Sequence, residues 1–570
     1  MLGRIMVGSV VRVPLHGRRI RAFVTTLMDE PAVQKVSTVS ALVSAEPLFD
    51  SATIALARWT ADRYVATLGT VLHRAVPGRF SAPPGPGDRP ALPDVGPPAW
   101  LPAPDAVADV VGRRGGAVVV PGSTNDEPEV VAHAVTTASR RGAASLVIAP
   151  RVSVARRVAS AIDGAVLLHG EMRPGQRASA WAAARDGVGS VIVGTRAALF
   201  VPVPDLGLVV VASAHDRSLK EERTPRLHAL HVARRRADAA RAAFLAVSPA
   251  PPLELAELEP IEPSRRPREP RPEVASPRGG PVTERLLAVV RESVSAGRDA
   301  LVFAGRRGAA LRIRCRDCGW YPRCDVCGAG LTALAAALRC RACGEVRPTP
   351  AVCGACGGSR LDGAGWGDER VAAVLGTADL PAPVIRVDAD APLPGDRARP
   401  AVLVGTIAAA WGLDGASVGA VCVADLDQLL GLPDFRAGEH ALGLLYDLAG
   451  VLEPGGRFLI QTREPDHHVV QAFTRRSWRY FADRELPQRR AAGLPPASEL
   501  VAVEGPAAAI DELIATVREP ASVLGPLERG RGRRAALVRA ANIDTVLPAI
   551  RALASAHDRV RVDRDPVDVI

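Results

Sequence analysis

The sequence lacks the apolar features that carry a protein into or across a membrane. Nowhere in its 570 residues do about 18 or more uncharged apolar residues follow one another, the length that a membrane-spanning helix needs. The segment from Met1 to Val13 also lacks the apolar stretch and cleavage site of a secretory signal peptide. The sequence therefore predicts no membrane span and no export, and we expect a cytoplasmic protein.

Charged residues are too few, and apolar residues too many, for a disordered chain. Hydrophobic residues make up 48% of the sequence and charged residues 23%, as in folded proteins. At roughly 150 residues per domain, the length predicts three to five domains. The net charge of +10 makes a polyanionic partner plausible. An arginine-rich genome would give the same excess, so charge alone does not decide.

Cysteine is sparse except in one segment. Eight of the nine cysteines lie within 315–356, as four C-x2-C pairs that are each followed by glycine. A zinc knuckle needs this glycine because its turn points backbone N–H groups at the thiolates. Without an export signal, the pattern indicates two structural Zn²⁺ ions rather than disulfides. A redox dithiol or an iron–sulfur site is the alternative.

The knuckles can pair in three ways, and loop length favours a nested arrangement. The 12-residue loop between Cys327 and Cys340 can form the hairpin of a zinc ribbon. Zinc 1 would then be held by Cys315, Cys318, Cys353 and Cys356, and zinc 2 by Cys324, Cys327, Cys340 and Cys343. Each closed site would contribute on the order of 10–16 kcal/mol to folding. We expect the ninth cysteine, Cys422, to be an inert core residue.

Stretches rich in proline and glycine divide the chain. The first domain should hold two short strands around Gly17, Arg18 and Arg19, and then a helix from about Asp50 to Leu68. The predicted divisions are a small β-rich domain at 1–80, a linker at 81–104, a first lobe at 105–250, a linker at 251–281, a second lobe at 282–470 with the cysteine module at 315–357, and an α+β C-terminal domain at 471–570.

Both lobes show short apolar runs that alternate with Ala-rich helical segments, which is typical of a parallel sheet covered on both faces. The runs of the first lobe are 117–120, 145–149, 165–168, 190–193 and 208–211. Those of the second lobe are 300–303, 384–387, 401–404, 420–423 and 457–461. The predicted fold class is therefore multidomain α/β with two similar lobes.

Several motifs in one order resemble a single family. Residues 194–200 (GTRAALF) are similar to G-T-R-S-A-L-F, 365–370 (GWGDER) to G-x-G-T-E-R, and 433–437 (PDFRA) to P-D-F-R-A. Weaker similarities lie at 11–14, 45–49, 69–77, 305–308 and 523–526. With the cysteine module inside the second lobe, they identify the chain as resembling the PriA (primosomal protein N′) family.

The resemblance implies a superfamily 2 DNA helicase with two RecA-like lobes that recognises abandoned replication forks. Its implied partners are forked or single-strand-containing DNA, other primosome proteins and single-strand-binding protein. The family's N-terminal domain engages a leading-strand 3′ end, and its outer and inner cysteines form separate zinc sites. Candidate DNA contacts are Arg12, Arg18, Arg19, Arg306 and Arg307, and also the arginines from Arg529 to Arg534 in the tail. Each cluster taken alone is also compatible with an ordinary solvated surface.

The chain departs from this family where a motor binds ATP. A P-loop needs glycines that cradle phosphate, a lysine on the terminal phosphates and a hydroxyl on Mg²⁺. Residues 121–130 read PGSTNDEPEV where the family has G-V-T-G-S-G-K-T-E-V. Glu127 thus replaces the lysine and Pro128 the threonine. A carboxylate there would repel the triphosphate, and Pro128 removes an N–H from the helix start.

Two further ATPase motifs agree. The family's D-E-E-H becomes Ala212, Ser213, Ala214 and His215, which removes the magnesium carboxylate and the general base. Its Q-V-A-G-R-A-G-R corresponds to 447–454 (DLAGVLEP), so Val451 and Pro454 replace both arginines that would stabilise transition-state charge. The loop after the second motif carries Leu219 and Leu227 where tyrosines are usual.

Two other differences limit the comparison with the family. The family's first strands are missing before Val10, and no room remains for its winged-helix domain after 81–104. The favoured hypothesis is a DNA-binding replication-restart protein with two structural zinc ions, for which ATP is not expected as a cofactor. One alternative is a residual ATP-dependent 3′→5′ helicase with an unorthodox nucleotide pocket. Another is a structural relic that binds partner proteins through the zinc module.

Overall fold

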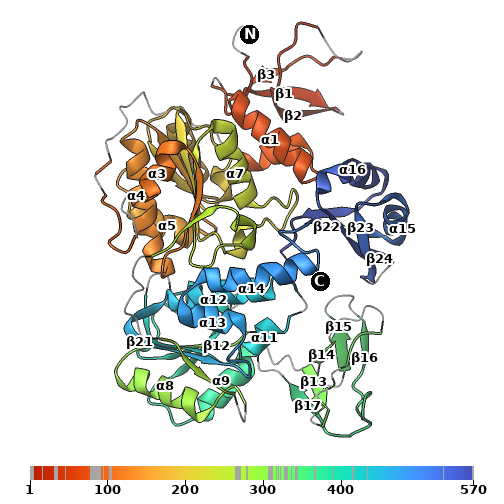
Figure 1. Cartoon of the computed structure of the whole chain (residues 1–570). Helices are drawn as coiled ribbons and strands as arrows, with labels where there is room; N and C mark the ends of the chain where they lie inside the picture. The colour runs from red at the N-terminus through yellow and green to blue at the C-terminus, as the bar shows by residue number, and fades with distance from the viewer. Residues whose placement is uncertain are drawn as a thin grey trace. The chain divides into compact units, whose positions relative to one another are not determined.

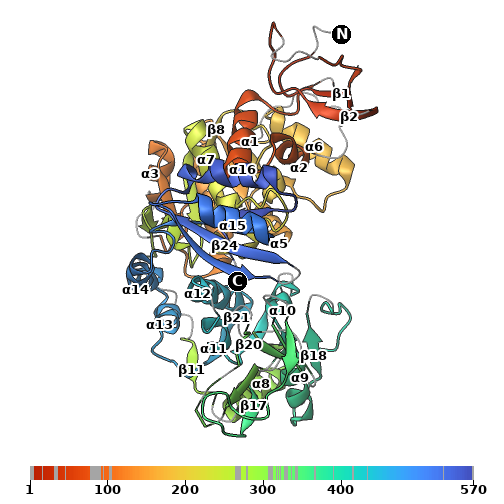
Figure 2. The same cartoon turned by 90° about the vertical axis from the view of Figure 1, so that its right-hand side faces the viewer.

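The computed structural model comprises two compact units, Met1–Arg266 with Asp563–Asp565, and Pro267–Val562 with Pro566–Ile570 (Figures 1 and 2). The described residues are 5–15, 17–30, 36–44, 46–76, 92–93, 95–101, 106–263, 271–277, 280–305, 312–315, 317–318, 320, 322–325, 331–334, 337–340, 345–364, 367–388, 391–413, 416–432, 434–529 and 532–567. None of the helices in these ranges combines the length and apolar character that crossing a bilayer requires.

The first unit begins with a three-stranded antiparallel sheet in the order β2-β1-β3. Its strands are β1 (Val10–Leu15), β2 (Arg18–Phe23) and β3 (Ala41–Leu42). Gly17 has a φ of +74°, a conformation that glycine adopts without strain, and closes the β1–β2 hairpin.

Two helices follow this sheet, where the sequence predicted one. They are α1 (Ser51–Arg63) and α2 (Leu68–Ala75). The Thr67 side chain accepts a hydrogen bond from the backbone of Thr70. A threonine in this position starts a new helix. The predicted helix at 50–68 is therefore confirmed at its start, but it ends at Arg63 instead of Leu68.

The first lobe is a seven-stranded parallel sheet in the order β10-β4-β9-β8-β5-β7-β6. Its strands are β4 (Gly116–Val119), β5 (Ala144–Ile148), β6 (Val166–Leu168), β7 (Val191–Gly194), β8 (Leu206–Ala212), β9 (Ala243–Val247) and β10 (Glu259–Ile261). The five predicted strands are confirmed to within two residues. Buried valines and alanines line both faces of the sheet, as expected for strands covered on both sides.

Helices flank this sheet on both faces. They are α3 (Ala106–Arg113), α4 (Glu127–Ser139), α5 (Val152–Ser160), α6 (Pro174–Arg185) and α7 (Ala229–Ala240). Figure 1 shows α4 and α5 on one face and α7 on the other.

The second unit contains another parallel sheet, in the order β11-β21-β20-β12-β19-β18. Its strands are β11 (Glu273–Ala275), β12 (Ala300–Phe303), β18 (Val384–Val387), β19 (Val402–Gly405), β20 (Val418–Val423) and β21 (Leu452–Gln461). Figure 1 shows α8 (Glu284–Ser295) and α9 (Asp368–Thr377) on one face and α12 (Ala437–Ala449) on the other. Two short helices, α10 (Ile407–Trp411) and α11 (Asp427–Leu430), complete the lobe. The two parallel α/β sheets confirm the predicted pair of RecA-like lobes.

Both linker predictions need correction. Within 251–281, β10 pairs with β4, and β11 pairs with β21. Each is an edge strand, so Pro260 in β10 and the surrounding charges are tolerated. Because this composition is also typical of linkers, the sequence did not predict the two strands. Within 81–104, the described residues Leu92, Val95 and Trp100 pack against the core of the first lobe.

The cysteine module lies between β12 and α9. It contains a two-stranded pair, β13 (Arg312–Cys315) with β17 (Leu361–Ala364), and an antiparallel sheet of β14 (Leu331–Leu334), β15 (Ala337–Cys340) and β16 (Val346–Pro348). The β14–β15 hairpin occupies the loop between Cys327 and Cys340, where the spacing predicted the hairpin of a zinc ribbon.

The C-terminal domain has a four-stranded sheet in the order β23-β24-β22-β25. Its strands are β22 (Glu499–Pro506), β23 (Ser522–Glu528), β24 (Arg533–Ala540) and β25 (Arg561–Arg564). Figures 1 and 2 show α15 (Ala507–Thr516) and α16 (Leu547–Ala556) side by side on it. The predicted boundary at residue 471 is wrong, because it falls inside α13 (His468–Arg475). This helix and α14 (Trp478–Ala491) pack next to α12 of the second lobe.

Candidate functional site

The outer four cysteines meet at one point. The Sγ atoms of Cys315, Cys318, Cys353 and Cys356 all lie within 4.8 Å of one another. The Sγ atoms of Cys315 and Cys356 are 3.7 Å apart, and those of Cys318 and Cys353 are 3.5 Å apart. A tetrahedral ion with Zn–S bonds of about 2.3 Å would separate its sulfurs by about 3.8 Å. The four thiols therefore fit a zinc ion.

The second of these pairs has the backbone of a zinc knuckle. The N–H groups of Ala355 and Cys356 point at the sulfur of Cys353, at N···S distances of 3.3 and 3.4 Å. The next residue, Gly357, has a φ of +70°, which a side chain would strain. These N–H groups would stabilise a thiolate, and a thiolate is the form that binds zinc.

Half of the inner cysteine set can be placed. Cys324 and Cys340 are buried and belong to a small core with Ile313, Leu331 and Leu338. Cys327 and Cys343 lie outside the described residues, so the second zinc site stays a prediction. The ninth cysteine, Cys422, is fully buried in β20, and burial raises the pKa of its thiol to about 12.

The segment that the sequence predicts to be a degenerate nucleotide loop joins β4 to α4. Its last residues, Thr124–Asp126, form a single 3-10 turn, and α4 begins at Glu127 with Pro128 in its first turn. Glu127 is fully buried, and its Oε2 accepts a hydrogen bond of 2.6 Å from the Oγ of Ser213. The partially positive N-terminus of a helix favours an anion. Here the chain's own carboxyl group lies at the start of the helix.

The second ATPase motif supplies the hydroxyl of this hydrogen bond. Ser213 directly follows β8 and has a φ of +47°. Its neighbours Ala212 and Ala214 are buried and carry no polar group. His215 contacts the hydroxyl of Ser248 through Nδ1 at 2.8 Å. The motif is therefore built into the core of the lobe instead of presenting carboxylates.

The carboxylate nearest to this motif has a structural partner. Asp216 accepts a bond of 2.7 Å from Nε of Arg151 and another of 2.8 Å from the backbone of Ser218. The third motif offers no cation, since Val451 follows α12 and Pro454 lies in β21. Between them, Glu453 pairs with Arg298.

The loop after the second motif is fixed by ion pairs that the sequence did not reveal. Leu219 and Leu227 are buried. Lys220 Nζ and Arg226 Nη1 lie 2.8 and 2.7 Å from the carboxylate of Asp563. Because Asp563 is more than 300 residues away in sequence, no local pattern could have predicted these contacts.

Asp565 lies in the same segment and is mostly buried, with 12% of its side chain exposed. Its Oδ2 is 3.0 Å from Nη2 of Arg63 and 3.9 Å from Nε2 of His231. Burial would raise the pKa of Asp565, but the facing groups of His231, Arg63 and Lys220 outweigh it and hold the pKa well below its usual range.

The N-terminal hairpin presents exposed arginines. Arg12 lies directly opposite Arg21 across the two strands, and Pro14 lies opposite Arg19. Since side chains alternate between the faces of a strand, Arg12, Arg19 and Arg21 share one face, whereas Arg18 lies on the other. Arg21 was missed from the sequence, although its spacing of two from Arg19 in a strand was the available signal.

The other predicted DNA contacts differ from those of the hairpin. Arg306 and Arg307 lie outside the described residues. In the C-terminal domain, Arg533 pairs with Glu504, and Arg534 pairs with both Glu528 and Asp511. The tail arginines are thus partly neutralised, whereas Arg12 and Arg21 of the hairpin lie directly opposite each other.

Two family models match the two ends of the chain. Residues 2–77 match the family model described as the PriA 3′ DNA-binding domain, and residues 490–567 match the Primosomal protein N C-terminal domain. The "Probable replication restart protein PriA" of Mycobacterium tuberculosis is 31% identical over 595 residues, covering 96% of this chain and 90% of that protein. The "Replication restart protein PriA" of Treponema pallidum is 28% identical over 635 residues, covering 100% of this chain and 96% of that protein.

Proposed function

We propose that this chain, which belongs to the PriA family of replication restart proteins, binds forked DNA during replication restart and does not hydrolyse ATP. The observation that carries the proposal is the hydrogen bond between Ser213 and Glu127 at the start of α4. It joins the residue that replaces the P-loop lysine to a residue of the motif that replaces the magnesium carboxylates. The two motifs are thus joined by a hydrogen bond.

This pair opposes nucleotide binding in two ways. A triphosphate at the start of α4 would meet a carboxyl group instead of an ammonium group, and at short range in a protein such repulsion amounts to several kcal/mol. The nucleotide would also have to displace Glu127 from a fully buried position, which breaks its hydrogen bond. Neither Ala212 nor Ala214 could hold the Mg²⁺ that accompanies ATP.

The hairpin supports DNA binding. Like charges directly opposite each other destabilise a strand pair, and Arg12 and Arg21 are in this position. A row of phosphates would relieve the repulsion and release counterions. We therefore assign the first DNA contact to the face that Arg12, Arg19 and Arg21 share, with Arg18 beside it at the turn. The family resemblance supplies the remaining partners, which are other primosome proteins and single-strand-binding protein.

Two structural zinc ions complete the proposal. When bound, each ion would hold its knuckles together by charge neutralisation of four thiolates, with no ligand position left for water. The outer site would join β13 to the segment that precedes β17, and the inner site would close the β14–β15 hairpin. The ions would serve folding, and no chemical step depends on them.

The proposed DNA binding can be tested by measuring the affinity of the protein for forked DNA and for blunt duplex DNA at a series of salt concentrations. The triple variant Arg12→Gln/Arg19→Gln/Arg21→Gln should bind both more weakly, with the salt slope reduced by roughly 0.9 for each phosphate that the variant no longer neutralises. A matched control is Arg113→Gln/Arg234→Gln/Arg285→Gln, since each of these arginines pairs with a glutamate. Equal slopes for both variants would contradict the assignment of the hairpin.

A further inference from the structure

Helix α14 presents a group of arginines that the proposed function does not use. Arg479, Arg484 and Arg490 are exposed on α14, and Arg475 is exposed at the end of α13. Figure 1 shows the two helices side by side. Within the described part of the chain, none of these four side chains, here called the α14 arginines, forms an ion pair with a carboxylate.

The acidic residues of α14 do not cancel this charge. Of the exposed residues of α14, a helix that the structure describes in full, only Asp483 is acidic. The other acidic residue, Glu485, is buried and pairs with Arg489 and His468. The inward side of the helix is therefore compensated by its own ion pairs, and the outward side keeps a net positive charge.

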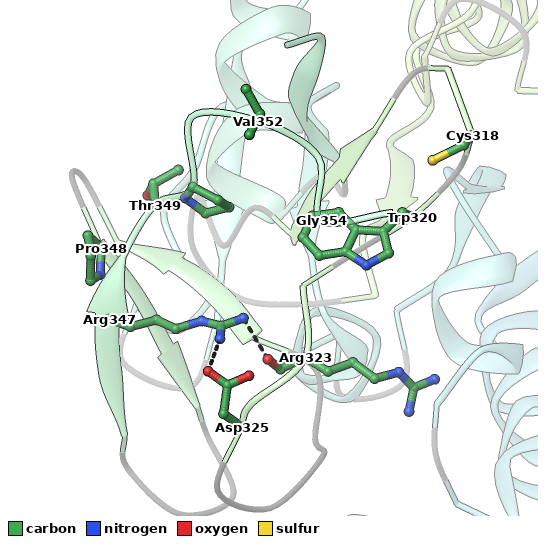
Figure 3. A pocket seen from close by; sticks show the side chains of 10 residues that line it. Cys318, Trp320, Arg323, Asp325, Arg347, Pro348, Thr349, Val352 and Gly354 are labelled. Carbon is green, nitrogen blue, oxygen red and sulfur yellow. Dashed lines mark hydrogen bonds and ion pairs between the residues drawn. The ribbon is translucent and has the colours of Figure 1, made fainter. Parts of the chain in front are cut away.

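The groove of the zinc module shows the opposite case. Its volume is about 790 Å³, and Figure 3 shows that Arg347, one of the residues that line it, pairs with Asp325. Trp320 in the same groove lies against Gly354, where an added Cβ would come within 2.7 Å of the indole. The charge of Arg347 is thus compensated inside the protein, which distinguishes it from the charge of the α14 arginines.

A tyrosine holds two of the α14 arginines in place. The Cζ atoms of Arg475 and Arg484 lie 4.8 and 3.5 Å from the centroid of the Tyr480 ring. The ring attracts each cation without neutralising it. Arg475 also donates a hydrogen bond of 3.2 Å to Gln471, and Arg484 donates one of 3.4 Å to the carbonyl oxygen of Tyr480. Both guanidinium groups are therefore oriented before a ligand binds, which lowers the entropic cost of binding.

This arrangement fits phosphates rather than bases. Proteins that bind single strands stack bases on open aromatic rings, but two guanidinium groups already lie over the ring of Tyr480. From Arg479 to Arg490 the helix rises by about 16 Å. A DNA duplex carries one phosphate for about every 1.7 Å of its axis, so several phosphates would lie within reach of such a helix.

An acidic protein segment is a poorer fit to the same surface. A protein partner binds chiefly through large side chains that become buried at the centre of the interface. The exposed residues of α14, all of them described, include no large apolar side chain that could take part in such a centre. Charge is the property that this surface offers, and the phosphate backbone of DNA requires nothing else.

We propose that the α14 arginines bind the phosphate backbone of double-stranded DNA, at a site separate from the N-terminal hairpin. The contact is independent of base sequence, because phosphates carry none. The proposal rests on the proposed function, to which it adds a second contact on another part of the chain.

The test measures the affinity of the full, zinc-loaded chain for a duplex whose ends are closed by non-nucleotide linkers, so that it carries no 3′ end. Arg479→Gln/Arg484→Gln/Arg490→Gln should weaken binding by about tenfold at low salt, with the salt slope reduced by roughly 0.9 for each phosphate contact that is lost. Arg479→Lys/Arg484→Lys/Arg490→Lys should keep the slope, because it keeps the charge. An unchanged slope in the glutamine variant would overturn the proposal.

Tyr480 provides a test of orientation apart from charge. Tyr480→Ala should weaken binding of the closed duplex and leave the salt slope unchanged, because all four cations remain. Tyr480→Phe keeps the ring and should bind like wild type. Wild-type affinity in Tyr480→Ala would contradict the positioning role of the ring.

The matched control is again Arg113→Gln/Arg234→Gln/Arg285→Gln, which removes three arginines that pair with glutamates. It should bind the closed duplex like wild type. A loss equal to that of the α14 glutamine variant would show that any three arginines suffice, and would overturn the site.

The α14 site and the hairpin can fail separately. If the hairpin variant loses fork binding but the α14 glutamine variant binds the closed duplex like wild type, only the α14 site is overturned. If the α14 variant loses duplex binding while the hairpin variant keeps its affinity for forks, the hairpin assignment fails and the α14 site stands. Polyglutamate that binds wild type but not the α14 variant, with equal duplex binding by both, would assign the surface to an acidic protein.

A second measurement needs no variant. Phenylglyoxal modifies accessible arginines, and mass spectrometry of the digested wild-type protein locates the modified residues. The closed duplex should protect Arg479, Arg484 and Arg490, whereas Arg113 should react equally with and without DNA. Equal modification of the three α14 residues in both conditions would overturn the proposal.

Discussion

The start of α4 and the outer cysteine cluster both gather groups that can carry negative charge, but they satisfy them in different ways. At α4 the carboxyl group of Glu127 is buried and accepts a hydrogen bond from Ser213, so the protein itself supplies the partner. In the cluster four thiols face one another within 4.8 Å, and as thiolates they need a cation. Under the proposed function, the difference means that a motif which has lost its ligand-binding residues can be absorbed into the core. A motif that keeps them leaves folding dependent on a ligand.

Removing one outer ligand should have the largest effect. Cys315→Ser should abolish the outer site, whose zinc we expect to contribute on the order of 10–16 kcal/mol to folding of the module. Metal analysis should find one zinc per chain fewer, and hydrogen exchange should show rapid exchange at 312–364. The control is Cys422→Ala, which removes the cysteine outside the knuckles. It should lose stability through a cavity but keep all its zinc. An unchanged zinc content in Cys315→Ser would contradict the outer zinc site.

Restoring the motor's lysine should have the next largest effect. Glu127→Lys places an ammonium group in a site built for a carboxyl group, so it should destabilise the first unit by about 3 kcal/mol. It should not restore ATP binding, because Ala212 and Ala214 still hold no Mg²⁺. Denaturant unfolding measures the cost. Glu129→Lys is the matched control, since this glutamate is exposed in the same turn of α4 and should cost only a few tenths of a kcal/mol. Equal costs would show that Glu127 is not satisfied by its surroundings.

Asp565 extends the comparison to a buried carboxylate whose partners are cations. Because its pKa is held below the usual range in the folded state, its contribution to stability is full above the unfolded pKa of about 3.9 and is lost as the pH falls below it. Asp565→Asn should be less stable than wild type at pH 7 by about 3 kcal/mol. The gap should narrow below about pH 4. A gap that does not change with pH would mean that the charge of Asp565 contributes little.

The smallest effect should come from the hydroxyl group in the degenerate site. Ser213→Ala leaves the buried carboxyl group without its 2.6 Å hydrogen bond, at a cost of about 1–3 kcal/mol. Thermal unfolding of this variant should be compared with that of Ser248→Ala. Both serines are buried, and they follow the neighbouring strands β8 and β9. If Ser213→Ala costs nothing, the Glu127 carboxyl group has other partners that suffice.

The sequence predicted the parts of the molecule that local pattern controls. Apolar runs located the central strands, and the C-x2-C-Gly spacing predicted the four outer cysteines that meet in the structure. The edge strands β10 and β11 were not predicted, since an edge position tolerates proline and charge. The end of α1 was not predicted because Thr67 starts a second helix.

The rest depends on residues that are distant in sequence. The sequence predicts Glu127 at the position of the P-loop lysine, but its partner Ser213 is 86 residues away. Nothing in the spacing indicates that two replaced motifs form a hydrogen bond. Likewise, the sequence shows Trp320 only as an aromatic residue that follows a knuckle. The contact between its indole ring and Gly354 is visible only in the fold.

The most direct test of the proposed loss of the motor is ATP hydrolysis by the zinc-loaded chain, with and without forked DNA that carries a 3′ leading-strand end. We expect no turnover in either case and normal binding of the fork. Turnover that forked DNA stimulates, and that substitution of Glu127 or Ser213 abolishes, would contradict the proposal and identify the chain as a working helicase.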